Sequence, residues 1–143
     1  MKKITNSGII QELNILKTYE DKKIPYKIAH AIAKNLQIVN GEYELYTKSL
    51  QKLLDRYKDH FIKDEKGNVS VDKSSGLPIV DSNAESYVKD INDLLSCEIE
   101  IEPYYIDESE LEYEPSEYYE VLTPKDIFIL MELLCKNEKD ESK

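Results

Sequence analysis

Several residue types that build common active sites are scarce in this chain. It has no tryptophan, four scattered glycines and a single arginine, Arg56. Without clustered glycines the sequence lacks the phosphate-binding loop, the dinucleotide-binding turn and the nucleophile elbow. Bidentate clamps on phosphate or carboxylate groups favour arginine, so they are nearly unavailable too. Paired carboxylates are present, but nothing in the sequence selects one pair. We therefore expect no catalytic residues and do not expect an enzyme.

Long apolar runs and metal-binding patterns are also missing. No run approaches the roughly 20 residues that cross a bilayer, and the start MKKITNSGII lacks the apolar stretch of a secretory signal. Two cysteines, Cys97 and Cys135, lie beside apolar residues, which favours two reduced core thiols over one disulfide. Residues 107–112 do not fit a calcium-binding EF-hand loop, and weak divalent-ion binding is the alternative. The sequence predicts a cytoplasmic protein with no cofactor, no metal site and no membrane partner.

The negative charge of the chain is concentrated in one place. The net charge is −10, yet residues 98–120, EIEIEPYYIDESELEYEPSEYYE, contain 10 of the 29 acidic residues and no lysine or arginine. We call these residues the acidic segment. The rest of the chain holds 19 acids and 19 bases and is formally neutral. Direct binding of nucleic acid is not expected, because phosphate binding needs clustered positive charge.

Apolar periodicity predicts four helices. The first begins at a cap on Asn6 or Ser7 and ends near Asp21. The second covers residues 26–60, with a weak point at Asn40-Gly41 where a turn is the alternative. Its apolar positions are spaced by three and four residues, as in a heptad seam. They are Ala29, Ile32, Leu36, Val39, Tyr43, Tyr46, Leu50, Leu53 and Tyr57.

Two further helices and a small β element complete the prediction. Ser82 and Glu85 form a capping-box pattern before a helix that buries Tyr87, Val88, Ile91, Leu94 and Leu95. Thr123 and Pro124 begin the last helix, and residues 137–143 are expected to be a frayed tail. Residues 69–71 and 77–80 suggest a β-hairpin, and residues 98–102 alternate as a strand with one wet face. The fold class is therefore α+β and mainly helical, with one long helix, in a single domain of residues 1–143.

Tyrosine makes the acidic segment unusual. A solubilising charge run does not need the five tyrosines of this segment, whereas tyrosine commonly anchors interfaces. The alternative is that the acidic segment is simply a solvated face that keeps the protein soluble. The functional interpretation is a docking surface for a basic partner. The candidate partner-binding residues are Glu98, Glu100, Glu102, Tyr104, Tyr105, Asp107, Glu108, Glu110, Glu112, Tyr113, Glu114 and Glu117.

Five features follow one another along the chain: Thr5-Asn6-Ser7-Gly8, Ile24-Pro25, Lys66-Gly67-Asn68, the EIEIE strand and the helix LTPKDIFILMELL. This layout resembles small proteins of phages that infect Gram-positive bacteria. The resemblance carries no catalytic residues. It implies a phage setting, in which small acidic non-enzymes are often inhibitors of host defence or morphogenesis factors.

Three functional hypotheses follow. In the first, a phage-encoded inhibitor of the anti-CRISPR or anti-restriction type docks its acidic segment on a basic, nucleic-acid-binding host defence protein. In the second, an oligomeric structural adaptor uses the heptad seam of the long helix, unless that seam packs within the monomer. In the third, the tyrosines of a nucleotide-sequestering sponge stack on bases.

Overall fold

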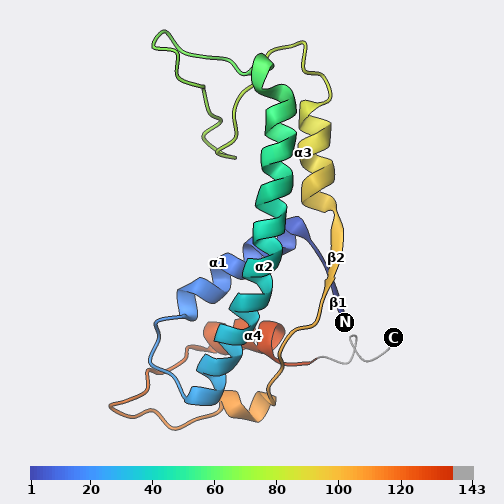
Figure 1. Cartoon of the computed structure of the whole chain (residues 1–143). Helices are drawn as coiled ribbons and strands as arrows, with labels where there is room; N and C mark the ends of the chain where they lie inside the picture. The colour runs from blue at the N-terminus through green and yellow to red at the C-terminus, as the bar shows by residue number, and fades with distance from the viewer. Residues whose placement is uncertain (137–143) are drawn as a thin grey trace. The chain divides into compact units, whose positions relative to one another are not determined.

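The computed structural model describes residues 1–136 and confirms a mainly helical α+β fold (Figure 1). The expected tail of residues 137–143 lies outside the described residues. The elements are β1 (Lys2–Thr5), α1 (Asn6–Tyr19), α2 (Tyr26–Tyr57), the 3-10 helix η1 (Lys58–His60), α3 (Tyr87–Ser96), β2 (Glu98–Ile101), the 3-10 helix η2 (Glu108–Leu111) and α4 (Pro124–Leu134).

The chain divides into two compact units, which are described separately. Unit 1 comprises residues 1–43 together with the chain from Glu98 onward, and unit 2 comprises residues 44–97. Helix α2 contributes its first part to unit 1 and its remainder to unit 2. The sequence predicted a single domain with no internal boundary. All candidate partner-binding residues belong to unit 1.

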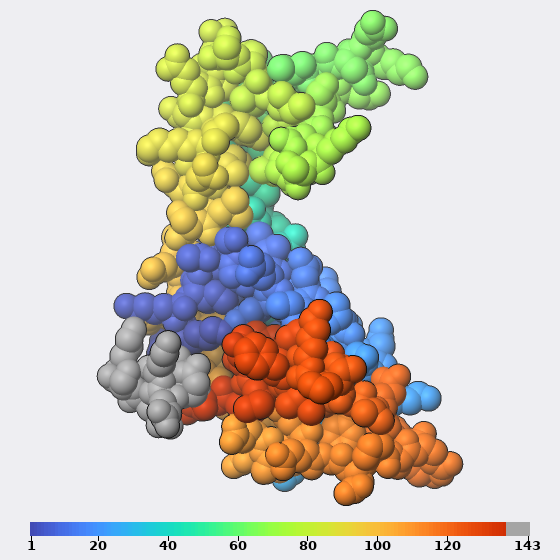
Figure 2. Space-filling model, turned by 180° about the vertical axis from the view of Figure 1, so that it is seen from behind, coloured from blue at the N-terminus to red at the C-terminus, as the bar shows by residue number. Residues whose placement is uncertain are grey.

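The core of unit 1 forms where α1, the first part of α2 and α4 pack together. Apolar residues at helical spacing on α1 are buried there, among them Ile9, Leu13 and Leu16. Helix α4 contributes Leu130 and Leu134, which are fully buried. Figure 2 shows α4 and the loop before it at the surface of unit 1, next to α1. Burial of these side chains stabilises the unit through the hydrophobic effect.

Local capping sets where the helices of unit 1 begin. The Thr5 hydroxyl accepts a hydrogen bond from the Gly8 N–H (3.0 Å), so the cap of α1 is Thr5 and not Asn6 or Ser7. At α4 the prediction is confirmed: Thr123 and Asp126 form a capping box and Pro124 is the first helical residue.

Helix α2 is continuous through Gly41. It has 32 residues and ends at Tyr57, where η1 continues the chain to His60. Five of the predicted seam positions are buried: Ile32, Leu36 and Val39 in the core of unit 1, and Tyr46 and Leu53 in unit 2. The seam therefore packs inside the protein, as the alternative to a coiled coil predicted.

The acidic strand is real, but its pairing partner was not predicted. Strand β2 pairs antiparallel with β1 at the N-terminus, in a register that places Ile4 opposite Ile99 and Lys3 opposite Glu100. Ile101 is buried in the core and Ile99 packs against it, while Glu98 and Glu100 are exposed. The strand ends at Ile101, before Pro103, because proline has no N–H for a sheet ladder.

Unit 2 contains the predicted hairpin region and corrects two expectations. Residues 69–71 and 77–80 do pair, through the isolated antiparallel bridge Val71↔Pro78 and without continuous strands. Gly67 and Gly76 take positive φ angles of 84° and 72°, which suits the turns beside them. The predicted cap at Ser82 is wrong. The Asp81 carboxylate accepts the Asn83 N–H (2.9 Å) and the chain turns there, so that α3 begins only at Tyr87.

The small core of unit 2 joins the end of α2 to α3. It contains Leu53, Ala84, Tyr87 and Ile91, with Leu94 and Leu95 packed against it. Val88, predicted to be buried, is 65% exposed. Cys97 is exposed whereas Cys135 is buried in unit 1, and both are thiols, so the expectation of two core thiols is wrong for Cys97.

Candidate functional site

Three consecutive stretches of unit 1 carry the acidic segment. They are strand β2 with Glu102, the turn of η2, and the loop of residues 113–120 before α4. The candidate residues therefore do not form one continuous row along a strand. Each stretch is fixed to the unit by different contacts.

The strand carboxylates are exposed on a paired strand. Glu98 and Glu100 lie on the wet face of β2, and Glu102 follows the strand as an exposed residue. Lys3 is directly opposite Glu100 in the ladder and is also exposed, which reduces the local negative charge. No ion pair of Glu100 or Glu102 with a lysine or arginine occurs within residues 1–136.

The η2 turn presents four carboxylates at short spacing. Asp107 caps η2 by accepting the Ser109 N–H (2.9 Å), and this hydrogen bond lowers the pKa of the Asp107 carboxyl group. Glu110 forms an ion pair with Lys27 of α2, with 3.1 Å between Lys27 Nζ and Glu110 Oε1. Leu111 is buried and holds η2 on the core. Glu108 and Glu112 are exposed.

Hydrogen bonds tie the loop before α4 to the segment between α1 and α2. The Glu120 N–H donates to the Lys23 carbonyl (2.7 Å), and the Glu120 carboxylate accepts the Lys23 N–H (3.0 Å). The Tyr113 hydroxyl donates to the Glu120 carbonyl, and its ring meets Tyr119 edge-on with centroids 5.9 Å apart. Burial, followed by the charges of Glu120 and Asp126, raises the pKa of Tyr113. Tyrosine thus helps to hold this stretch in place, while Glu114, Glu117 and Tyr118 remain exposed.

A buried asparagine fixes Tyr104 to α2. The Asn35 side chain donates to the Tyr104 carbonyl (2.7 Å) and accepts the Tyr104 N–H (3.0 Å). It also donates to the Ala31 carbonyl within α2 (2.9 Å), and the residue is only 6% exposed. This pair of hydrogen bonds to the N–H and the carbonyl of one residue sets the position of Tyr104 independently of its own ring.

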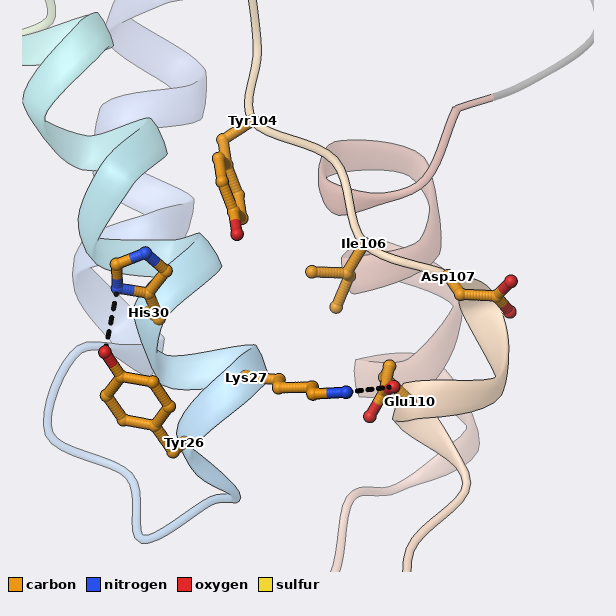
Figure 3. Close-up of a pocket in the computed structure, with 7 residues that line it drawn as sticks. All are labelled: Tyr26, Lys27, His30, Tyr104, Ile106, Asp107 and Glu110. Carbon is orange, nitrogen blue, oxygen red and sulfur yellow. Dashed lines mark hydrogen bonds and ion pairs between the residues drawn. The ribbon is translucent and has the colours of Figure 1, made fainter.

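The fixed Tyr104 completes an aromatic hollow of about 480 Å³ (Figure 3). Tyr26 and His30 lie one turn apart on α2, with ring centroids 5.4 Å apart at 24°. The Tyr104 ring meets His30 edge-on, 5.3 Å away at 87°. We call this site the aromatic hollow. Its lining residues are Tyr26, Lys27, His30, Tyr104, Ile106, Asp107 and Glu110.

The arrangement of side chains in Figure 3 separates the aromatic and charged parts of the hollow. Lys27 extends from α2 toward Glu110 and closes one side with an ion pair. Tyr104 lies between His30 and Ile106, and the Asp107 carboxylate points away from the rings. Tyr104 also lines a second, neighbouring hollow together with Glu102 and Lys34. Through Tyr104, the aromatic hollow is therefore next to the end of the acidic strand.

Comparison with protein-family models, curated proteins and solved structures found no match. The geometry of the chain must therefore carry the functional argument. Among residues 1–136 no helix is long and apolar enough to span a membrane. In the same residues no three histidine, cysteine, aspartate or glutamate side chains are grouped to hold a metal ion.

The structure brings together only part of the predicted site. Tyr104, Asp107 and Glu110 meet at the aromatic hollow, whereas Glu98 and Glu100 lie on β2, and Glu114 and Glu117 lie on the loop before α4. Tyr105 is half-buried. Sequence reasoning missed the contributions of α2, namely Tyr26, His30 and Asn35. The spacing of Tyr26 and His30 by four residues was readable, but their meeting with Tyr104 was not.

Proposed function

We propose that this protein is a non-enzymatic binding protein that docks its acidic segment on the basic surface of a nucleic-acid-binding protein. One observation carries the proposal. Six of its ten carboxylates are exposed and form no ion pair with a lysine or arginine of residues 1–136, namely Glu100, Glu102, Glu108, Glu112, Glu114 and Glu117. These carboxylates can therefore meet cations from outside the chain.

Electrostatics favours this class of partner. Surfaces that hold DNA or RNA are lined with lysine and arginine, so they are complementary to a dense set of carboxylates. Long-range attraction would speed the encounter, and tyrosines beside the carboxylates would supply contact area. The protein would then occupy the surface on which the partner binds nucleic acid, and so inhibit it.

The resemblance to phage proteins suggests which partners to test first. We propose an inhibitor of a bacterial defence protein, such as a CRISPR effector or a restriction enzyme, acting in the cytoplasm of the host cell. The adaptor hypothesis is weaker, since buried seam positions of α2 are unavailable for a coiled coil. Light scattering tests it directly, because a monomer in solution excludes an adaptor built on that seam.

The experiment is capture of partners from a bacterial lysate, followed by competition. Proteins bound to the immobilised wild-type chain are identified by mass spectrometry, purified and mixed with labelled duplex DNA or RNA. The proposal predicts that added wild-type protein displaces the nucleic acid from the captured partner. Captured proteins that bind no nucleic acid, or that keep it at saturating inhibitor, would contradict the proposal.

Two triple variants with the same change in net charge provide the control. Glu98→Lys, Glu100→Lys and Glu102→Lys together should abolish displacement. In the matched variant, three exposed acids of unit 2 are reversed, namely Glu44, Glu65 and Glu85. This variant should still displace nucleic acid. Circular dichroism checks that both variants are folded.

A further inference from the structure

The aromatic hollow has a more specific chemistry than the rest of the acidic segment. We propose that it receives an arginine side chain of the basic partner, whose planar guanidinium group lies against the tyrosine rings. This inference rests on the proposed function and deepens it, because it names the group that the partner inserts. It concerns Tyr26, His30 and Tyr104, which β2 does not contribute.

The walls of the aromatic hollow are suited to a planar cation. Three rings from two separate stretches of chain surround one space, and the faces of tyrosine rings attract cations. Tyr26 is 74% exposed and Tyr104 is 40% exposed, so both rings are open to an incoming group. Guanidinium is flat and weakly hydrated, and it stacks on aromatic faces more readily than the ammonium group of lysine does.

The second argument is charge. Glu110 stands at the hollow, Asp107 lines it with its carboxylate turned outward, and Glu102 and Lys34 line the neighbouring space beside Tyr104. The one lysine of the hollow, Lys27, is already paired with Glu110. The hollow therefore offers a phosphate group no unpaired lysine or arginine, which disfavours a nucleotide. A guanidinium group would gain from the negative charge of the acidic segment around the hollow.

The third argument is that the hollow is formed in advance. Asn35 holds the backbone of Tyr104, and Tyr26 and His30 are placed by the same helix. The Tyr26 hydroxyl also lies 3.5 Å from His30 Nδ1. Less side-chain ordering is then needed when a ligand enters, which favours affinity. Preformed aromatic sites of this kind are typical of interface hot spots, where a few aromatic residues dominate binding.

The test uses nuclear magnetic resonance of the aromatic side chains in the full-length protein. The probes are a short capped glycine peptide with one central arginine and matched peptides with lysine or with citrulline, which is neutral and has nearly the same shape as arginine. We expect saturable shifts of the Tyr26, His30 and Tyr104 ring signals with the arginine peptide. Shifts should be weaker with lysine and absent with citrulline. Equal responses to arginine and citrulline, or shifts with ATP in place of arginine, would overturn the proposal.

Variants separate the role of the rings from general effects. Tyr26→Leu with Tyr104→Leu should weaken binding of the arginine peptide about tenfold, the scale of a cation–aromatic contact. Tyr26→Phe with Tyr104→Phe keeps both rings and should retain most of the affinity. Tyr118→Leu removes a tyrosine that is 72% exposed and outside the hollow, and should change nothing. An equal loss in the Tyr118 variant would count against the hollow.

The test of the hollow and the test of the proposed function can fail separately. Suppose that the ring signals do not shift with the arginine peptide, while the reversal of Glu98, Glu100 and Glu102 still abolishes displacement of nucleic acid from the partner. The hollow inference is then wrong and the proposed function stands. Conversely, arginine binding in the hollow without any dependence of displacement on the strand acids would retain the hollow and refute the proposed docking surface.

Discussion

Asn35 shows how one residue can organise a site from inside the core. Its amide joins the helix that carries Tyr26 and His30 to the backbone of Tyr104, 69 residues later in the chain. A buried amide that bonds both the N–H and the carbonyl of one residue satisfies one backbone donor and one backbone acceptor together. Removal of this side chain leaves both groups of Tyr104 without their partner.

We therefore predict that Asn35→Ala lowers the free energy of unfolding by about 1–3 kcal/mol, the cost of leaving buried polar groups unsatisfied. In the same variant, the nuclear magnetic resonance signals of the Tyr104 ring should no longer show its contact with the His30 ring. Urea denaturation measures the stability, and Asn40→Ala is the matched control on the exposed side of the same helix. A difference below about 0.5 kcal/mol between the two variants would show that the Asn35 contact is not important.

Tyr19 and Asp126 form another long-range polar contact, in which the Tyr19 hydroxyl donates to Asp126 Oδ1 (2.7 Å). Burial, followed by this hydrogen bond and the Asp126 charge, raises the pKa of Tyr19 to about 12. The same contact, together with capping of α4, lowers the pKa of Asp126. The folded chain therefore prefers the neutral phenol and the charged carboxylate.

The pH dependence of stability follows from the raised Tyr19 pKa. The folded state keeps the Tyr19 proton at pH values where the unfolded chain loses it, so this contribution is complete below about pH 10 and disappears as the pH rises toward 12. Tyr19→Phe should remove that part of the alkaline loss of stability. Urea unfolding at several values from about pH 8 to about pH 12 tests this, with Tyr118→Phe as control. Identical pH profiles for wild type and Tyr19→Phe would disprove the coupling.

The Asn35–Tyr104 and Tyr19–Asp126 contacts could not be predicted from the sequence. The capping residues Thr123 and Asp126 were readable because their partners lie within one helical turn. Asn35–Tyr104 and Tyr19–Asp126 join residues 69 and 107 positions apart, and no local pattern relates them. The sequence could therefore predict the tyrosines of the acidic segment, but not the side chains of α2 that meet them.

At the scale of elements, two glycines in helices have opposite surroundings. A Cβ atom added to Gly41 of α2 meets nothing within 4 Å, whereas one added to Gly8 of α1 comes within 2.6 Å of Ile4 Cγ1. Gly41 therefore lowers helix stability without any steric need. Gly8 leaves room for β1 to approach the first turn of α1.

We predict that Gly41→Ala raises the free energy of unfolding by about 0.5–1 kcal/mol, because alanine restricts the unfolded chain and suits a helix. Gly8→Ala should lower it, since Ile4 must move. Thermal and urea unfolding of both variants measure the pair. A destabilised Gly41→Ala would indicate that α2 is not a regular helix at this position.

Elements were predictable where local signals agreed and wrong where a competing local contact prevailed. The three-and-four spacing of α2 outweighed Gly41, and the alternation of β2 was confirmed. The cap pattern at Ser82 failed because Asp81 made the turn first. Strand β1 was missed because its four residues show no alternation long enough to distinguish them from the start of a helix.

At the scale of the whole molecule, the proposed docking depends on the position of the negative charge more than on its amount. The net charge of −10 alone would attract any cationic protein. The proposal is narrower, since it requires that reversal of the strand acids near Tyr104 matters more than reversal of equally exposed acids elsewhere. The sequence itself shows that the acids are concentrated in residues 98–120. It could not predict that Lys3 and Lys27 would approach two of them.

The most direct measurement of this claim is a salt titration with a labelled oligoarginine peptide, followed by fluorescence anisotropy. The wild-type affinity should fall steadily as salt rises. At low salt, the Glu98, Glu100 and Glu102 reversal should weaken binding about tenfold relative to the equally charged Glu44, Glu65 and Glu85 reversal, as expected for three exposed charge pairs. Equal affinities of the two variants, or a wild-type affinity that does not change with salt, would contradict the account.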